Sequence, residues 1–107
     1  MGSFAHVDEE SFNSEVIQSE LPVILEFGAA WCVPCKRLEP ILEELEKAWS
    51  GRVRLAKLDV DQCPELTAGH NIMTVPTVIL YVNGTPVQRL TGLQTLDRLV
   101  DKLEPYL

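Results

Sequence analysis

The sequence predicts an α/β domain in which helices cover both faces of a mixed β-sheet. Strand-like segments alternate along the chain with amphipathic helical segments, and this order requires parallel crossovers between strands. The Asn83-Gly84 pair, between two further strand-like segments, predicts a tight hairpin and therefore an antiparallel edge. With 46% hydrophobic residues, residues 1–107 are expected to form a single domain with a core of its own.

The first half of the chain predicts a helix, a strand and a longer helix, in that order. Asp8, with two acidic residues after it, is typical of a helix N-cap. The nearly continuous apolar run at residues 22–27 predicts a central strand buried on both faces, although Glu26 lies inside it. From Pro34 onward the apolar residues follow helical spacing, and Pro40 predicts a kink in that helix without ending it.

The second half of the chain predicts three strands and two helices. Residues 53–60 alternate between apolar and polar side chains and predict a strand, after which Pro64 opens a short helix. The hairpin joins a strand at residues 77–82 to one at residues 86–91, which its initial proline places at the edge of the sheet. A final amphipathic helix follows, and Thr95 is its expected cap.

The charge balance argues against two classes of partner. The chain has 9 basic and 16 acidic side chains, for a net charge of −7. A nucleic-acid binder normally carries a basic stripe, and an anionic membrane surface repels an acidic chain, so neither nucleic acid nor membrane is expected. The apolar stretches are far shorter than the roughly 20 residues that span a bilayer. Because the first residues also show no secretory signal, we expect a cytoplasmic location.

Three cysteines carry the strongest functional signal. Cys32 and Cys35 form a Cys-x-x-Cys pair that runs from a loop into a helix, and Cys63 stands alone. At a helix N-terminus the unpaired N–H groups stabilise a thiolate, which is the nucleophilic form of the side chain. The second thiol, one turn later, can resolve a mixed disulfide. The pair therefore predicts thiol-disulfide exchange. The alternatives are half a zinc site or two inert core thiols, but a closed zinc site needs four ligands, so no metal is expected.

Several motifs occur along the chain in a definite order. They are Trp31-Cys32-Val33-Pro34-Cys35-Lys36, Val75-Pro76-Thr77 before a strand and Gly92 after the last strand, with further matches at Phe27, Pro40, Lys57, Asp59 to Asp61 and Asn83-Gly84. Together these motifs cover essentially the whole chain, which resembles the thioredoxin family. The resemblance implies the thioredoxin fold and a protein-disulfide reductase that needs no cofactor beyond its Cys32–Cys35 disulfide. It also implies disulfide-containing protein substrates, a thioredoxin reductase as partner, and a monomer.

The same resemblance assigns roles to residues around the cysteines. Cys32 would be the exposed nucleophile and Cys35 the buried resolving thiol. Pro76 matches the family's cis-proline, which packs against the disulfide; the alternative is an ordinary trans proline. The backbone of Val75 would then be free to pair with an extended substrate. The residues expected to bind substrate are Trp31, Val33, Pro34, Val75, Pro76 and Gly92.

Glu26 occupies the position where the family typically has a buried aspartate. A carboxyl group desolvated in an apolar strand has a raised pKa, which suits proton exchange with Cys35. Lys57, on the adjacent predicted strand, matches a lysine of the family and could pair with Glu26. The alternative is a glutamate whose side chain reaches solvent at the end of the strand.

Several positions depart from the family pattern. Val33 replaces the usual glycine, and the residues between the cysteines tune the reduction potential. Gly28 stands where an aromatic residue is frequent, which leaves less packing under the active-site loop. Met73 and Thr74 precede Val75 in the loop expected to face substrate, so we expect a shifted preference for partners.

The remaining aromatic, histidine and cysteine side chains allow plainer interpretations. Trp31 is expected to flank the site, to pack on the Asp59–Asp61 turn, or to do both. His6 and His70 are expected at the surface without a role. Cys63 meets the N-terminus of a short helix, which could lower its pKa and make it a site of oxidation. The alternative is a small, half-buried and inert residue.

These features favour an electron carrier that reduces protein disulfides and is itself reduced by a reductase. Two alternatives are a specialised redox protein of the same fold with a shifted potential, and a binding or chaperone module without turnover. Pro34 favours the reductant, and the presence of both Cys32 and Cys35 argues against the binding module.

Overall fold

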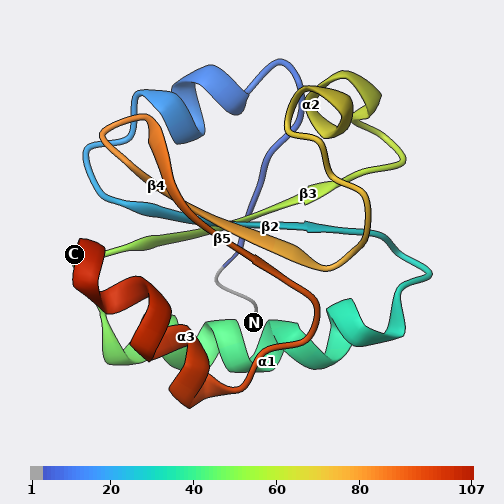
Figure 1. Ribbon diagram of the computed structural model, residues 1–107. Coiled ribbons are helices and arrows are strands. Elements are labelled where there is room, and N and C mark those ends of the chain that lie inside the picture. Colours follow the sequence, from blue (N-terminus) through green and yellow to red (C-terminus); the bar gives the residue numbers. More distant parts are fainter. Residues whose placement is uncertain (1–3) are drawn as a thin grey trace.

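The computed structural model describes residues 4–107, which fold around a five-stranded sheet with helices above and below it (Figure 1). The first three residues of the N-terminal segment lie outside the described residues. In chain order the elements are β1 (Ala5–His6), η1 (Asn13–Ile17), β2 (Val23–Gly28), α1 (Val33–Ala48), β3 (Arg54–Asp59), α2 (Pro64–Gly69), β4 (Thr77–Val82), β5 (Thr85–Thr91), α3 (Leu96–Leu103) and η2 (Glu104–Tyr106). The predicted α/β class is confirmed. Within residues 4–107, every helix is too short or too polar to cross a bilayer.

The sheet combines parallel and antiparallel pairing, in the strand order β1-β3-β2-β4-β5. β1 and β2 run parallel to β3, while β4 runs antiparallel to both β2 and β5. β2 is the central strand and all of its residues are buried, as its apolar run predicts. The register sets Glu26 beside Lys57 and Phe27 beside Thr77. The start of β4 therefore lies at the end of β2, where the chain leads toward the cysteines.

The turn between β4 and β5 has the geometry that its sequence predicts. Asn83 and Gly84 have φ values of 53° and 77°, and a type I′ turn requires a positive φ at both positions. Gly84 also lies close to the N-terminal half of the chain, because a Cβ there would stand 2.6 Å from the carbonyl oxygen of Ile17. β5 lies at the edge of the sheet, as the proline at position 86 predicts.

Two apolar layers hold the helices to the sheet. On the face covered by α1 and α3, the buried helix side chains are Leu38, Leu42, Leu45, Leu99 and Leu103. On the face covered by η1 and α2, the layer includes Val16, Phe27 and Cys63. Burial of one leucine side chain stabilises a fold by roughly 1.5–3 kcal/mol. The leucines of α1 therefore anchor the helix that begins beside the cysteine pair.

The N-terminal region differs from its prediction in two ways. β1 has only two residues and is defined by its pairing with the edge of β3, so no alternation along the sequence indicates it. The helix expected directly after Asp8 is a short π-helix at Asn13–Ile17. Between them, Asp8 Oδ1 accepts hydrogen bonds from the N–H groups of Glu10 and Ser11. Asp8 therefore caps a turn that precedes the helix.

The prediction for His70 is wrong, whereas His6 is exposed as expected. The His70 ring is half-buried, with its centroid 5.1 Å from that of Phe27. Its Nδ1 lies 2.7 Å from the carbonyl oxygen of Leu66, and its Nε2 forms a hydrogen bond with the hydroxyl of Tyr81. His70 thus ties the end of α2 to β4.

Candidate active site

The cysteine pair lies at the N-terminus of α1, where the sequence predicts it. Cys32 and Cys35 form a disulfide with a Cα–Cα distance of 5.3 Å. Cys32 is the N-cap residue of the helix, and its Sγ accepts a hydrogen bond of 3.1 Å from the N–H of Cys35. The first N–H groups of a helix carry a partial positive charge. Negative charge that develops on the Cys32 sulfur is therefore stabilised by the helix itself.

The two sulfurs differ little in exposure while they are joined. Cys35 is 0% exposed, as expected, but Cys32 is only 3% exposed. The expected exposure of Cys32 is therefore wrong for the disulfide form, because the same sulfur bonds Cys35 and caps α1. Its neighbours are open to solvent: Val33 is exposed, and Trp31 is 67% exposed while its Nε1 donates to Asp61 Oδ2 at 2.8 Å. Trp31 is thus exposed next to the disulfide and at the same time bound to the Asp59–Asp61 turn, while its contact with partners stays a prediction.

Pro76 and Gly92 meet at the start of β4. The Val75–Pro76 peptide bond is cis, as the resemblance implies, and the carbonyl oxygen of Pro76 accepts a hydrogen bond of 2.8 Å from the N–H of Gly92. Gly92 has a φ of +89°, a left-handed conformation that favours glycine. β4 starts beside the end of β2. Pro76 and Gly92 therefore lie at the same end of the strands as the loop that leads to Cys32.

Glu26 is fully buried in β2. Its side chain is 0% exposed, and within residues 4–107 neither carboxyl oxygen has a hydrogen-bond partner. Burial is the main cause that raises the pKa of Glu26 to about 8; the nearby negative charge of Glu39 adds to it, and Lys57 opposes it. The alternative of a side chain that reaches solvent is wrong.

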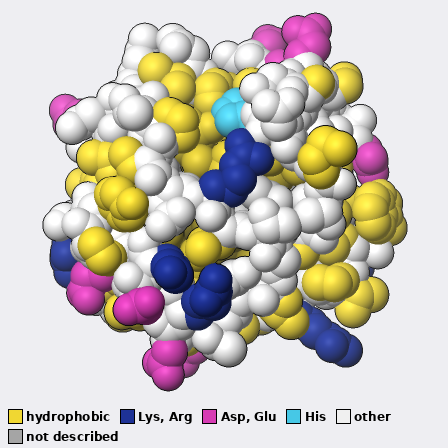
Figure 2. All heavy atoms as spheres, in the orientation of Figure 1, with side chains coloured by type: hydrophobic (Ala, Val, Ile, Leu, Met, Phe, Trp, Pro, Cys, Tyr) yellow, Lys and Arg dark blue, Asp and Glu magenta, His cyan; other side chains and the backbone are white. Residues whose placement is uncertain are grey.

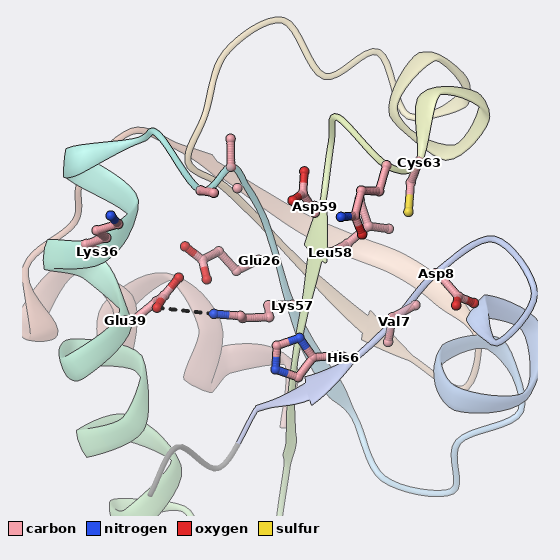
Figure 3. A pocket seen from close by; sticks show the side chains of 14 residues that line it. His6, Val7, Asp8, Glu26, Lys36, Glu39, Lys57, Leu58, Asp59 and Cys63 are labelled. Carbon is pink, nitrogen blue, oxygen red and sulfur yellow. Dashed lines mark hydrogen bonds and ion pairs between the residues drawn. The ribbon is translucent and has the colours of Figure 1, made fainter.

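The expected partner of Glu26 is bound to another residue. Lys57 lies beside Glu26 in the register of the sheet, but its Nζ is 3.4 Å from Oε1 of Glu39 (Figure 3). Glu39 comes from α1 and follows Cys35 by four residues, which places both on one side of the helix. Glu39 is a site residue that was not predicted from the sequence, although its helical spacing from Cys35 would have indicated it.

Gly28 leaves space between the buried carboxyl and the buried sulfur. A Cβ at this position would stand 3.2 Å from Cys35 Sγ and 3.4 Å from Glu26 Oε2. The Glu26 carboxyl and the Cys35 sulfur therefore both lie against Gly28, at the point where another residue would have its side chain. Beside them lies a pocket of about 400 Å³, whose lining includes Glu26, Gly28, Lys36, Glu39, Lys57 and Asp59.

Cys63 does not share the environment of the pair. It is 1% exposed and occupies the N-cap position of α2, but its side chain makes no capping hydrogen bond. The Oε2 atom of Glu9 accepts the N–H groups of Glu65 and Leu66 instead, at 2.7 and 3.1 Å. Burial, and then the negative charges of Glu9 and Asp8, raise the pKa of Cys63. A lowered pKa at this position is therefore wrong.

This chain is similar to known proteins that are named thioredoxins. The Thioredoxin family model matches residues 3–105. The thioredoxin of Alicyclobacillus acidocaldarius is 43% identical over 93 residues, which are 87% of this chain and 89% of that protein. The thioredoxin of Rickettsia felis is 38% identical over 96 residues, or 90% and 91% of the two chains. The thioredoxin of a Synechocystis strain is 33% identical over 107 residues and the full length of both.

Proposed function

Because the chain belongs to the thioredoxin family, we propose that Cys32 and Cys35 divide between them the two steps of protein-disulfide reduction. The protein is a thiol-disulfide oxidoreductase that works through its own cysteine pair without an external cofactor. This function is favoured over a binding module without turnover and over a specialised redox task. The observation that carries the division of roles is that the Cys32 sulfur caps α1.

In the first step, the Cys32 thiolate of the reduced protein attacks a disulfide of the substrate. The substrate S–S bond breaks, one substrate thiolate leaves, and a mixed disulfide joins Cys32 to the other half. In the second step, the Cys35 thiol loses its proton and attacks Cys32 Sγ, which releases the second substrate thiolate and forms the Cys32–Cys35 disulfide. Two electrons have then passed from the protein to the substrate, and a reductase must return them.

Glu26 is the proposed acceptor for the proton of Cys35. Its carboxyl and Cys35 Sγ both lie against Gly28, and its pKa of about 8 lies close to neutral pH. A group with a pKa near the working pH can both accept and donate a proton efficiently. Glu26 would take the proton when the disulfide forms and return it when the disulfide is reduced.

The proposed substrate surface surrounds the disulfide at the end of the sheet where β2 ends. It consists of Trp31, Val33, Pro34, Val75, Pro76 and Gly92, joined by the exposed Met73 and Leu93. The pairing of Phe27, Thr77 and Thr91 in one row across the sheet brings these loops to the same end. Hydrophobic side chains gather where the loops before α1 and β4 meet (Figure 2). Such a surface fits an extended apolar segment that flanks a substrate disulfide.

The partners of the reaction follow from its chemistry. Members of this family act on disulfide-containing proteins, and a separate reductase partner regenerates their dithiol. We propose a thioredoxin reductase as that enzyme, a monomeric state and a cytoplasmic location. A single domain over residues 1–107 belongs to the same proposal.

The division of roles can be tested by alkylation and by trapping. Brief treatment of the reduced protein with iodoacetamide at neutral pH should label Cys32 before Cys35, as peptide mapping would show. Cys35→Ser should accumulate a mixed disulfide with one chain of disulfide-bonded insulin, because the second step is blocked, whereas Cys32→Ser should trap nothing. Preferential labelling of Cys35, or trapping by Cys32→Ser alone, would reverse the assignment.

A further inference from the structure

Glu39 lies beside the buried carboxyl of Glu26 and is the more exposed of the two. The side chain of Glu26 is 0% exposed, whereas the Glu39 side chain is 27% exposed and lines the same pocket. Figure 3 shows the two carboxyl groups close together, with the Lys57 ammonium beside Glu39. We propose that Glu39 is a positioning residue of the reaction, which acts through Glu26 as the outer carboxyl of a proton relay.

The need for such a group follows from the burial of Glu26. A proton that moves from Cys35 to Glu26 must later reach water, although the Glu26 side chain is itself 0% exposed. Glu39 is the carboxyl group near enough to act on Glu26. Glu39 is the carboxyl of α1 that faces the pocket one turn after Cys35. It therefore offers a second proton site between the buried pair and the pocket.

The ion pair between Glu39 and Lys57 keeps the lysine from neutralising Glu26. Lys57 is the register neighbour of Glu26, and without Glu39 its ammonium could turn to the Glu26 carboxyl. An opposite charge within about 4–6 Å favours the ionised carboxylate, and a like charge favours the protonated acid. Glu39 thus acts twice on Glu26, by its own negative charge and by holding Lys57. The other titratable side chains that line the pocket are His6, Asp8, Lys36, Asp59 and Cys63.

The proposed proton path has balanced steps. When Cys35 attacks Cys32 Sγ in the mixed disulfide, the Cys35 proton passes to the Glu26 carboxylate and the substrate thiolate leaves with its electron pair. The proton then passes from Glu26 to the Glu39 carboxylate and from there to water in the pocket. When a reductase opens the disulfide, the same path runs in reverse. This inference rests on the proposed role of Glu26.

The first test follows the Glu26 carboxyl directly, by ¹³C NMR titration of the oxidised full chain labelled in glutamate. Glu39→Gln removes one negative charge and releases Lys57, so the Glu26 midpoint should fall by about one pH unit or more. Glu44, exposed on the same helix, offers the matched control: Glu44→Gln should leave the midpoint unchanged. An unchanged midpoint in Glu39→Gln would overturn the proposal.

The second test separates proton transfer from the electric field of the carboxylate. Stopped-flow reaction of the reduced protein with a nitrothiobenzoate disulfide resolves the release of the first and second coloured thiolates, and the second reports attack by Cys35. In Glu39→Gln/Lys57→Met both charges are gone, so the Glu26 midpoint should return toward its wild-type value. The second release should nevertheless stay about 10-fold slower than in wild type, with an altered pH profile, because the outer carboxyl is missing.

The roles of Glu26 and Glu39 can be tested separately. If Glu26→Gln releases the second thiolate as fast as wild type, then the proposed role of Glu26 is wrong. If Glu26→Gln is slow but the double variant matches wild type, then the role of Glu26 stands and the relay through Glu39 is wrong.

Discussion

Two cysteines of this protein occupy the N-cap position of a helix with a proline in its first turn, and their surroundings differ. At α1, the sulfur of Cys32 accepts the N–H of Cys35. At α2, the carboxylate of Glu9 accepts hydrogen bonds from two N–H groups of the first turn, and the Cys63 side chain makes no capping hydrogen bond. The first sulfur belongs to the reactive pair, while the second is a buried thiol with a raised pKa.

The comparison shows that a helix N-terminus favours a thiolate only where its N–H groups remain available to sulfur. Glu9 approaches α2 from far along the chain and supplies a negative charge at the place where a thiolate would form. α2 also has 6 residues against 16 in α1, so fewer peptide dipoles act at its start. A similar local sequence therefore leads to opposite chemistry.

The largest effect should come from exchanging one sulfur for oxygen. Cys32→Ser should reduce insulin-disulfide reduction by about 1,000-fold or more, because a serine hydroxyl does not form a nucleophilic anion at neutral pH. Cys63→Ser should keep full activity in the same assay. A comparable loss of activity in both variants would mean that Cys63 also takes part in the reaction, and the contrast between the two cysteines would be wrong.

A second effect concerns the stability of the active-site region. The folded state holds the proton of Glu26 up to a pKa of about 8, whereas an unfolded chain releases it near the ordinary value of 4.5. The folded state therefore loses stability as the pH rises from about 4.5 to about 8. Glu26→Gln should remove this loss. Denaturant unfolding should show a free energy of unfolding that is higher by ~2–4 kcal/mol at pH 9 and little changed at pH 4. Equal shifts at both pH values would show that Glu26 is not a buried acid.

A smaller effect should appear at α2 when the charge of Glu9 is removed. Glu9→Gln eliminates a negative charge that raises the pKa of Cys63, so the ¹³Cβ titration midpoint of Cys63 should fall. The weaker cap should also cost about 0.5–1 kcal/mol in the free energy of unfolding. Glu10→Gln, also exposed in the same turn, is the matched control and should change neither quantity. An unchanged midpoint in Glu9→Gln would mean that burial alone governs Cys63.

The smallest effect is expected when the protein is oxidised. Under mild peroxide or oxidised glutathione, the wild-type chain should run as a monomer on a non-reducing gel and show no mass adduct at Cys63, because the thiol is buried and mostly protonated. Cys63→Ser should behave identically. A dimer or adduct that depends on Cys63 would give this cysteine a regulatory chemistry of its own.

Local sequence signals predicted the parts of the molecule that depend on neighbouring residues. The Asn83-Gly84 turn, the Thr95 cap of α3 and the position of Cys32 at the start of α1 follow from backbone conformation and from hydrogen bonds within a few residues. The cis bond before Pro76 came instead from the family resemblance, since no local rule requires it.

Contacts between distant segments could not be predicted in this way. β1 exists only because β3 offers an unpaired edge, and two residues carry no pattern. The sequence indicated Glu26 as the partner of Lys57, and the pairing with Glu39 instead depends on how α1 packs across the sheet. Glu9, which accepts hydrogen bonds from the α2 N–H groups, lies more than fifty residues before them. The residues next to Cys63 in the sequence therefore could not predict its environment.

The two edge strands of the sheet determine how readily strands of other chains can pair with this protein. β1 offers only two residues, and β5 carries Pro86 and a register shift opposite Leu80 and Tyr81. Long, regular edges invite strands of other chains and seed aggregation, whereas short or interrupted edges resist it. An extended substrate segment at the proposed Val75 site would therefore meet no long, regular edge along which to extend its pairing.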